Sequence, residues 1–353
     1  MQRLNKAIRW INLLLILTTF LAYLSPYVHP GTFWMFSFFG MAYPWLLLLN
    51  IFFVLFWSFR KDRYFLFSLA CIIMGWGHFT RFIGLNVDNI APADESAYTT
   101  VMSYNIHALA SLRFGTKREK SEKIDLFYEL FEKEKPAILC VQEAGGVSAQ
   151  FLDEQLQMPY RHNIVGKGTA IHTTFPIVDK GEIDFGTKIN SCLWADLQIG
   201  ASVFRVYSTH LQSNRVSSLA DQVIQGGDLQ DQQTWLDIGG MIGRVKRAAA
   251  IRAEQAELIA QHIAQSPHRV IVCGDFNDTP QSYTYRKIAE GLHDGFCQSG
   301  SGFGTTYAGS IPALRIDYIL HDPSIPIGQH KILRIPLSDH YPVISKLRLK
   351  AAG

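Results

Sequence analysis

The stretch from Phe33 to Phe59 contains no charged residue, which limits how the first part of the chain can fold. Apolar runs flank it on both sides, from Trp10 to Tyr27 and from Tyr64 to Leu85, the latter apolar as far as His78 and Arg81. A helix of about 20 apolar residues crosses the roughly 30 Å hydrocarbon core of a bilayer. The sequence therefore predicts a membrane anchor in residues 1–85 with three transmembrane helices, at about 10–27, 33–59 and 64–85.

Three other interpretations of these runs are weaker. A cleaved signal peptide would explain Arg3, Lys6 and Arg9 ahead of the first run, but no small-x-small cleavage site follows it. A buried helical domain would explain the second and third runs, but uncharged stretches of this length are rare in soluble cores. A transporter or channel is not indicated, because the runs hold almost no ionisable residue that would line a pathway.

Basic residues predict the orientation of these helices. They precede the first run or separate the second from the third: Arg3, Lys6, Arg9, Arg60, Lys61 and Arg63. The connection at residues 25–32 has neither Lys nor Arg. By the positive-inside rule we expect a multi-pass protein of a bacterial inner membrane, with the N-terminus in the cytoplasm and everything after about Asn86 in the periplasm.

The remainder of the chain has the pattern of a mixed domain. Residues 86–97 have the composition of a linker, and residues 98–353 contain short strands separated by turns. Two amphipathic helices are expected, at Lys120 to Glu134 and Gly243 to Gln265. Strands without regular βαβ alternation favour an α+β layered domain over a Rossmann fold. The polar segment from Ser213 to Gly240 is either a substrate-selecting lid or a solvated surface loop.

Short polar clusters follow the predicted strands of this domain. They contain carboxylates, carboxamides and two histidines: Asn105, Glu143, His210, Asp275, Asn277, Asp317, Asp339 and His340. Carboxylate and amide oxygens suit Mg²⁺ or Mn²⁺, and imidazoles suit proton transfer. Each cluster alone has an ordinary structural explanation, such as an Asx-turn at Asp275 and Asn277. Together they predict a metal-assisted hydrolase that cuts phosphate esters.

The order of these motifs resembles that of the endonuclease/exonuclease/phosphatase superfamily, which includes DNase I-like nucleases, inositol polyphosphate 5-phosphatases and bacterial sphingomyelinases. The resemblance covers Thr99 to about Leu349. It rests on Ser-Tyr-Asn105-Ile, Val-Gln-Glu143, Thr-Ala-Ile-His-Thr-Thr-Phe-Pro-Ile, Ser-Thr-His210-Leu, Gly-Asp275-Phe-Asn277, Arg-Ile-Asp317-Tyr-Ile-Leu and Ser-Asp339-His340-Tyr-Pro-Val. It implies a four-layer β-sandwich of two mixed β-sheets flanked by helices, with the site at one rim.

The resemblance also implies which residues hold the metal and the phosphate. Glu143 would be the principal ligand of Mg²⁺ or Mn²⁺, with Asn105 beside it and Asp339 in the same metal region. Asp275 and Asn277 would bind or orient the phosphate and the attacking water.

The histidines take the remaining roles by the same resemblance. His340, oriented by Asp317, would be the base or the electrostatic partner of the scissile phosphate, and His210 would contact that phosphate from the other side. Independently of the resemblance, Arg315 near Asp317 is expected to shape a substrate pocket together with neighbouring aromatic residues, or else to belong to a structural turn.

These observations predict a membrane-anchored phosphoesterase, with no obligate protein partner evident. The net charge is +3, and residues 1–94 contribute +4 of it, which leaves −1 for residues 95–353. A nearly neutral domain lacks the broad basic surface of most non-specific nucleic-acid binders, which weakens a nuclease without excluding it. The substrate is therefore a nucleic acid, a phospholipid or sphingolipid head group, or a soluble phosphomonoester. The alternative is a catalytically inactive, membrane-tethered binding module on the same scaffold.

Overall fold

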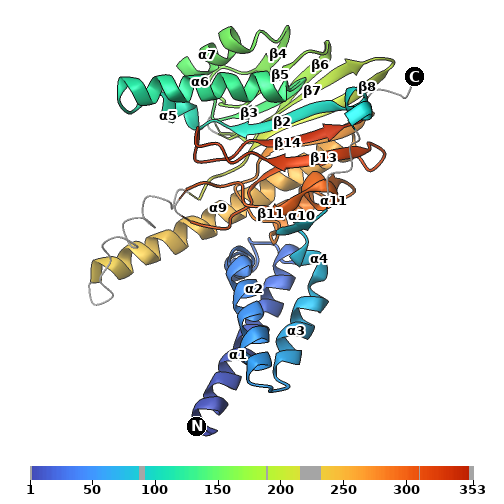
Figure 1. Ribbon diagram of the computed structural model, residues 1–353. Helices are drawn as coiled ribbons and strands as arrows, with labels where there is room; N and C mark the ends of the chain where they lie inside the picture. The colour runs from blue at the N-terminus through green and yellow to red at the C-terminus, as the bar shows by residue number, and fades with distance from the viewer. Residues whose placement is uncertain (1, 87–91, 188–189, 215–231, 310, 350–353) are drawn as a thin grey trace.

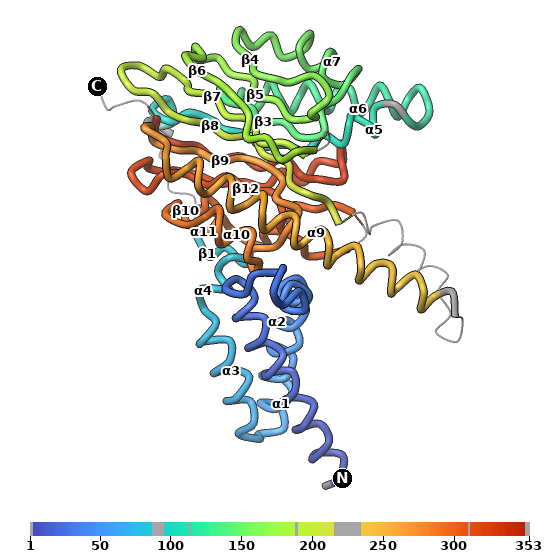
Figure 2. The backbone as a smooth tube through the Cα atoms, turned by 180° about the vertical axis from the view of Figure 1, so that it is seen from behind, coloured from blue at the N-terminus to red at the C-terminus, as the bar shows by residue number. Residues whose placement is uncertain are grey.

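The protein has two units, a bundle of N-terminal helices and a larger domain of sheets and helices that lies at one end of the bundle (Figure 1). The computed structural model describes residues 2–86, 92–187, 190–214, 232–309 and 311–349. The N-terminus lies at the end of the bundle that is remote from the domain, as both views show (Figures 1 and 2).

Three helical segments run side by side in the N-terminal unit (Figure 1). Their elements are α1 (Gln2–Leu24), η1 (Ser25–Tyr27), α2 (Met35–Phe59), α3 (Phe65–Met74) and α4 (Trp76–Phe79). By length and composition, α1 and α2 are able to cross a membrane. In α2, Pro44 is accommodated inside the helix.

The third predicted membrane helix, at residues 64–85, is wrong as a continuous helix. Helix α3 ends after 10 residues, α4 has only 4, and Ile83–Leu85 forms strand β1. Gly75 interrupts the helix because glycine favours helix poorly and because the Tyr23 ring occupies the space beside it, where a Cβ would lie 2.1 Å from the hydroxyl oxygen. The described residues therefore contain two helices, rather than three, that are long enough to span a bilayer.

Buried polar side chains join the helices of this unit to one another. The Asn12 amide donates to the Ser68 hydroxyl at 2.7 Å and accepts from the Trp57 indole at 3.0 Å. Asn50 donates to the Thr19 hydroxyl at 2.9 Å. These bonds explain why an otherwise apolar sequence carries asparagines, since a polar group buried among apolar side chains is costly unless it is paired.

Two six-stranded mixed sheets form the centre of the larger domain, in the orders β10-β12-β9-β8-β7-β6 and β13-β14-β2-β3-β5-β4. The strands of the first are β6 (Ile177–Ile183), β7 (Ser191–Ile199), β8 (Ser202–His210), β9 (Arg269–Asp275), β10 (His293–Asp294) and β12 (Asp317–His321). Those of the second are β2 (Thr99–Asn105), β3 (Ile138–Gln142), β4 (Tyr160–Asn163), β5 (Ala170–Thr173), β13 (Ile327–Ile332) and β14 (Val343–Leu347). Each sheet has one parallel pair, β8 with β9 and β2 with β3.

Helices cover the outer faces of both sheets, which confirms the predicted α+β four-layer sandwich (Figures 1 and 2). The helices and turns of this domain are η2 (Pro92–Ala97), η3 (His107–Leu109), α5 (Ala110–Arg113), α6 (Lys117–Glu134), α7 (Val147–Leu156), α9 (Gln232–Ala264), α10 (Tyr283–Ile288) and α11 (Gly295–Ser299). Residues such as Phe127 and Leu152 pack α6 and α7 on the second sheet, and Ile259 and Ile288 pack α9 and α10 on the first. A third apolar cluster, which includes Val101 and Ile271, lies between the sheets.

Helix α9 begins earlier than predicted. It starts at Gln232, so the last part of the polar segment at residues 213–240 is helical, whereas residues 215–231 lie outside the described part of the chain. The prediction of a lid or solvated loop thus applies only to the residues before the helix. The first half of α9 extends beyond the sheets (Figure 1).

The segment that follows the helices, residues 82–85, is bonded directly to the larger domain. Strand β1 pairs antiparallel with β11 (Ser301–Phe303), and the Gly304 amide donates to the Phe82 carbonyl at 2.9 Å. The end of the predicted third span is therefore a strand that fastens the two units together. The predicted linker at residues 86–97 includes η2 and residues 87–91, the latter outside the described part.

Candidate active site

Three predicted site residues lie side by side on the first sheet because the strands that carry them are in register. Asp275, the last residue of β9, is opposite His210 on β8 and opposite Asp317 on β12. Residues at opposed positions on neighbouring strands present their side chains on the same face of a sheet. Gly274 permits this close approach, because a Cβ at that position would lie 2.0 Å from the Thr209 carbonyl oxygen.

The second sheet contributes its predicted residues at the same rim. Asn105 ends β2 and Glu143 directly follows β3, and the two strands are parallel, so their ends lie together. The Asn105 amide donates to Glu143 Oε1 and to Asp275 Oδ2, both at 3.0 Å. One carboxamide therefore links the two sheets through the two carboxylates.

Glu143 and Asn277 both adopt left-handed backbone conformations, with φ of 57° and 51°. Such values are uncommon outside glycine and concentrate at functional sites. Asn277 is held by hydrogen bonds from its backbone N–H to Asp275 Oδ1 at 2.8 Å and from its side chain to the Leu211 carbonyl at 3.0 Å. These hydrogen bonds keep Asn277 beside Asp275.

His340 and Asp317 form the predicted pair. The Nδ1 atom of His340 lies 2.9 Å from Asp317 Oδ2, and both side chains are buried. Nε2 is left facing Asp275 Oδ2 at 3.8 Å. The Tyr307 ring packs edge-on against the imidazole at 5.3 Å between centroids. Burial disfavours the protonated form of His340. The nearby carboxylates of Asp317 and Asp275 outweigh this effect and raise the pKa of His340 to about 10.

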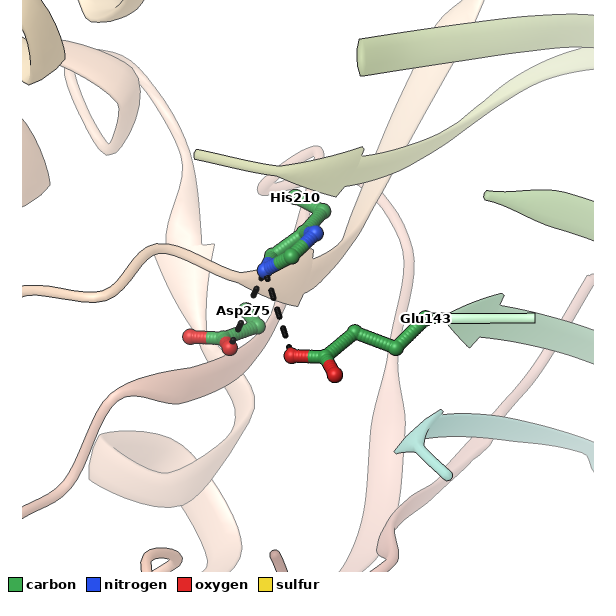
Figure 3. Close-up of side chains that lie close together, drawn as sticks. All are labelled: Glu143, His210 and Asp275. Atoms are coloured by element: carbon green, nitrogen blue, oxygen red, sulfur yellow. Dashed lines mark ion pairs between the residues drawn. The ribbon is translucent and has the colours of Figure 1, made fainter. Parts of the chain in front are cut away.

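His210 points between two carboxylates, as Figure 3 shows. Its Nε2 lies 3.6 Å from Glu143 Oε1 and 3.8 Å from Asp275 Oδ2, and it has no hydrogen-bond partner although it is buried. Burial lowers the pKa of His210, which favours the neutral imidazole. A buried ring nitrogen without a partner is costly, so the orientation of His210 fits a ligand bound between this nitrogen and the two carboxylates.

The donor set fits a divalent metal. Glu143, His210 and Asp275 bring one ligand atom each to within 4.8 Å of one another, as do Asp275, Asp317 and His340. Burial raises the pKa of Asp275 to about 7. A carboxylate this buried remains an anion only beside positive charge, which a divalent cation supplies.

Two further residues complete the rim: Asp339, which was predicted, and His107, which was not. His107 Nδ1 lies 3.2 Å from Asp339 Oδ1. This hydrogen bond raises the pKa of His107, and it lowers the pKa of Asp339 despite the opposing effect of burial. His107 is two residues after Asn105, within the Asn-Ile-His sequence, and that closeness is the signal that could have revealed it.

Arg315 does not lie where a substrate-binding role was expected. Its side chain is buried, with the guanidinium 2.6 Å from Asp294 Oδ2 and 2.9 Å from the carbonyl oxygen of Arg81. Arg315 therefore holds Arg81, at the end of the helical unit, against the larger domain. The sequence pattern could not distinguish this pairing from a surface cation near Asp317.

A pocket opens over the cluster, and Glu143, Asn277, Asp339 and His340 are among its lining residues. A second depression lies on the other side of Glu143 and is lined by residues that include Lys167 and His210. The structure thus brings together at one rim all the predicted metal and catalytic residues, whereas Arg315, predicted to bind substrate, lies apart from them.

Comparison with known proteins agrees with this geometry. Residues 102–340 match the model of the endonuclease/exonuclease/phosphatase family. The chain belongs to this family. Its members are phosphoric ester hydrolases that use a divalent metal, so the chain is an enzyme of this class. Residues 5–82 match a domain of unknown function (DUF8431), and no curated protein matches the chain in sequence.

Solved structures support the fold of this family member. An endonuclease/exonuclease/phosphatase from Bacteroides vulgatus is 17% identical, with a TM-score of 0.52, over 72% of this chain and 99% of that chain. A family protein from Bacteroides thetaiotaomicron is 17% identical, with a TM-score of 0.51, over 71% and 94%. D. rerio TDP2 complexed with a single-strand DNA product is 15% identical, with a TM-score of 0.51, over 71% and 98%.

Proposed function

We propose that the protein is a membrane-anchored, divalent-metal-dependent phosphoesterase that hydrolyses phosphate esters by attack of water. The observation that carries this proposal is the convergence of Asn105, Glu143, His210, Asp275 and His340 at the rim of the two sheets. These residues come from distant segments of the chain, and packing of a core alone does not require buried carboxylates and imidazoles to meet.

Glu143 would be the principal metal ligand, with Asn105 beside it and Asp339 in the same region. Carboxylate and amide oxygens favour Mg²⁺ or Mn²⁺. The bound ion would neutralise charge on the non-bridging oxygens of the phosphate. Asp275 would orient the phosphate and the attacking water, supported by its bonds to Asn105 and to the Asn277 backbone.

The two histidines would act on the phosphate from different sides. Asp317 accepts from Nδ1 of His340 and so fixes the tautomer and the ring orientation, leaving Nε2 to hold or move a proton at the pocket. His210 Nε2 and the side chain of Asn277 would contact the phosphate oxygens. Hydrogen bonds aimed at a phosphate stabilise the charge that develops during in-line attack.

The experiment uses the full chain in detergent with bis-(p-nitrophenyl) phosphate. Hydrolysis should require Mg²⁺ or Mn²⁺, and EDTA should abolish it. Glu143→Gln should lower kcat by roughly 100-fold or more, because it removes a metal-binding charge. The matched control is Glu132→Gln, an exposed glutamate on α6, which should leave turnover unchanged. Wild-type turnover in Glu143→Gln would refute the metal assignment, and a folded wild type without activity would favour the inactive binding module.

We also propose that the helical unit spans the bacterial inner membrane, with the N-terminus in the cytoplasm and the catalytic domain in the periplasm. Support comes from the basic residues that lie together at the end of the unit remote from the domain, where Arg9 pairs with Asp62 at 2.7 Å and Arg60 donates to Asn5 at 3.1 Å. The chain runs along the unit three times, the third time as the short pair α3 and α4, so the N-terminus and the domain lie at opposite ends. An alkaline phosphatase fusion after residue 100 should be active, and a silent fusion would reverse the orientation.

The substrate would be a nucleic acid or a phospholipid or sphingolipid head group. A nucleic acid is supported by the DNA product bound to D. rerio TDP2, which shares the fold. A lipid is supported by the two apolar helices and by the net charge of −1 over residues 95–353, which remains when the +4 of residues 1–94 is taken from +3. Release of head group from lipid vesicles and cleavage of single-stranded DNA, measured with metal, would separate the two.

A further inference from the structure

One wall of the candidate active-site pocket comes from the helical unit. Met41, in the second turn of α2, lines the same pocket as Glu143, Asn277 and His340. This could not be predicted from the sequence, in which Met41 lies inside a predicted membrane span. The pocket is therefore shared between the catalytic domain and a helix that is able to cross a bilayer.

Close contacts fix α2 and α1 against the segment that follows Asn277. The Thr279 hydroxyl contacts the Gly40 carbonyl oxygen at 3.4 Å, and the Gln281 side chain donates to the Ala22 carbonyl at 2.8 Å. At Gly40 the approach is so close that a Cβ would lie 2.2 Å from the Gln281 carbonyl oxygen. Met41 is thus held in place at the pocket by packing and hydrogen bonds on both sides.

The lining of the pocket is chemically mixed. Its lining combines carboxylates, amides and the imidazole of His340 with the apolar side chains of Met41, Ile311 and Leu314. Neither Lys nor Arg is among the described residues that line it. Nucleic-acid sites rely on Lys and Arg to contact phosphates along the strand, so this composition favours a different kind of substrate.

The helix that supplies Met41 also exposes apolar side chains along its length. Helix α2 exposes Met35, Leu48, Phe52 and Leu55, whose side chains are each about half exposed (52% or more in every case). Exposed apolar surface of this extent on a helix is covered by the hydrocarbon of a bilayer. Because α2 begins at Met35, Met41 lies only about 9 Å along its axis from the helix end nearest the domain. With α2 in a bilayer, the pocket would lie at the level of the membrane surface.

We propose that the substrate is the phosphate ester of a membrane-resident amphiphile. Its phosphate reaches the cluster around Glu143 and His340, and its apolar part leaves the pocket along Met41 and Ile311 toward the bilayer. The helical unit is then part of the substrate site as well as an anchor. This inference rests on the proposed phosphoesterase function and adds the class of substrate to it.

The test compares p-nitrophenyl phosphodiesters whose second ester is methyl, butyl or octyl, assayed with Mg²⁺ and the full chain at a fixed detergent concentration. Burial of each methylene against the wall favours binding about fourfold, so kcat/KM should rise at least about tenfold from methyl to octyl. Met41→Gln should reduce this octyl-to-methyl ratio at least about fivefold. Met35→Gln, an exposed methionine on the same helix, is the matched control and should keep the ratio of the wild type.

A second variant shows whether the effect of Met41→Gln comes from the lost apolar contact or from misfolding. Ile311→Gln changes the same wall from the catalytic domain and should lower the ratio in the same direction, with the melting temperature of both variants measured alongside. Equal kcat/KM across the series, a ratio that survives both substitutions, or faster cleavage of a single-stranded oligonucleotide than of the octyl ester would overturn the inference while leaving the phosphoesterase intact. Absence of hydrolysis of every ester, methyl included, would overturn the phosphoesterase function and the inference with it.

Discussion

Replacement of Gly40 by alanine tests whether the helical unit positions the segment that follows Asn277, residues 278–281. A Cβ at Gly40 would lie 2.2 Å from the Gln281 carbonyl oxygen and 2.4 Å from the Ser25 hydroxyl. The serine can rotate away, but the Gln281 carbonyl belongs to the backbone. Moving it from 2.2 Å to the 3.0 Å that real contacts require displaces this segment by about 0.8 Å, four residues after Asn277.

The size of the effect follows from that displacement. Overpacking of a buried contact costs about 1–3 kcal/mol. In a protein of this size that lowers Tm by roughly 1–4 °C. A shift of about 1 Å near reacting groups reduces turnover by up to about 100-fold. We therefore expect Gly40→Ala to lower Tm by a few degrees and kcat/KM for bis-(p-nitrophenyl) phosphate by roughly 10- to 100-fold.

The assay measures Tm and kcat/KM of the full chain in detergent with Mg²⁺. Gly77→Ala is the matched control, because it also lies in the helical unit but nothing is within 4 Å of a Cβ built there. It should leave kcat/KM unchanged and Tm unchanged or slightly raised, since alanine favours helix over glycine. If Gly40→Ala matches the wild type in both quantities, the helical unit does not constrain residues 278–281 and the reasoning is wrong.

Three further predictions concern buried charge. Asp294→Asn leaves the buried guanidinium of Arg315 without its carboxylate partner and should lower the free energy of unfolding by about 3–5 kcal/mol in denaturant titration. Asp317→Asn removes the carboxylate that orients His340 and should lower kcat by roughly 10²–10⁴-fold with little change in KM, as steady-state kinetics will measure. Burial lowers the pKa of His330 to about 3, so the unfolded chain binds the proton first as the pH falls. Stability present above pH about 6.5 is therefore lost toward pH 3, by about 2 kcal/mol at pH 5, and His330→Gln should remove this loss when unfolding is compared at pH 5 and 7.5.

The sequence predicted the sheets and most of the site because strand ends and polar clusters are local features. Each cluster directly follows or precedes a strand of β-branched and apolar residues, as in the Val-Ile-Val-Cys-Gly segment before Asp275. A carboxylate there must emerge from the sheet or meet a partner, so its place at a rim follows from the cost of burying charge. The parallel pairing of β2 with β3 and of β8 with β9 then brought the ends together.

The errors arose where a local pattern depended on a distant partner. The apolar run after Tyr64 predicted one long helix, but Gly75 lies against Tyr23 and the last residues pair with β11 instead of continuing the helix. Arg315 resembled a substrate cation, but its carboxylate partner Asp294 is on another strand. No spacing in the sequence links either pair.

Residue types and their positions at strand ends were enough to predict a phosphoric ester hydrolase, because carboxylates, amides and imidazoles at those positions suit a hard cation and proton transfer. How the site is enclosed depends on contacts between distant segments and could be seen only in the folded protein. Contacts among α1, α2 and the segment after Asn277 place Met41 at the pocket, and these contacts join residues more than two hundred positions apart. Their strength depends on how surfaces pack in three dimensions, which hydrophobic periodicity along one segment does not encode.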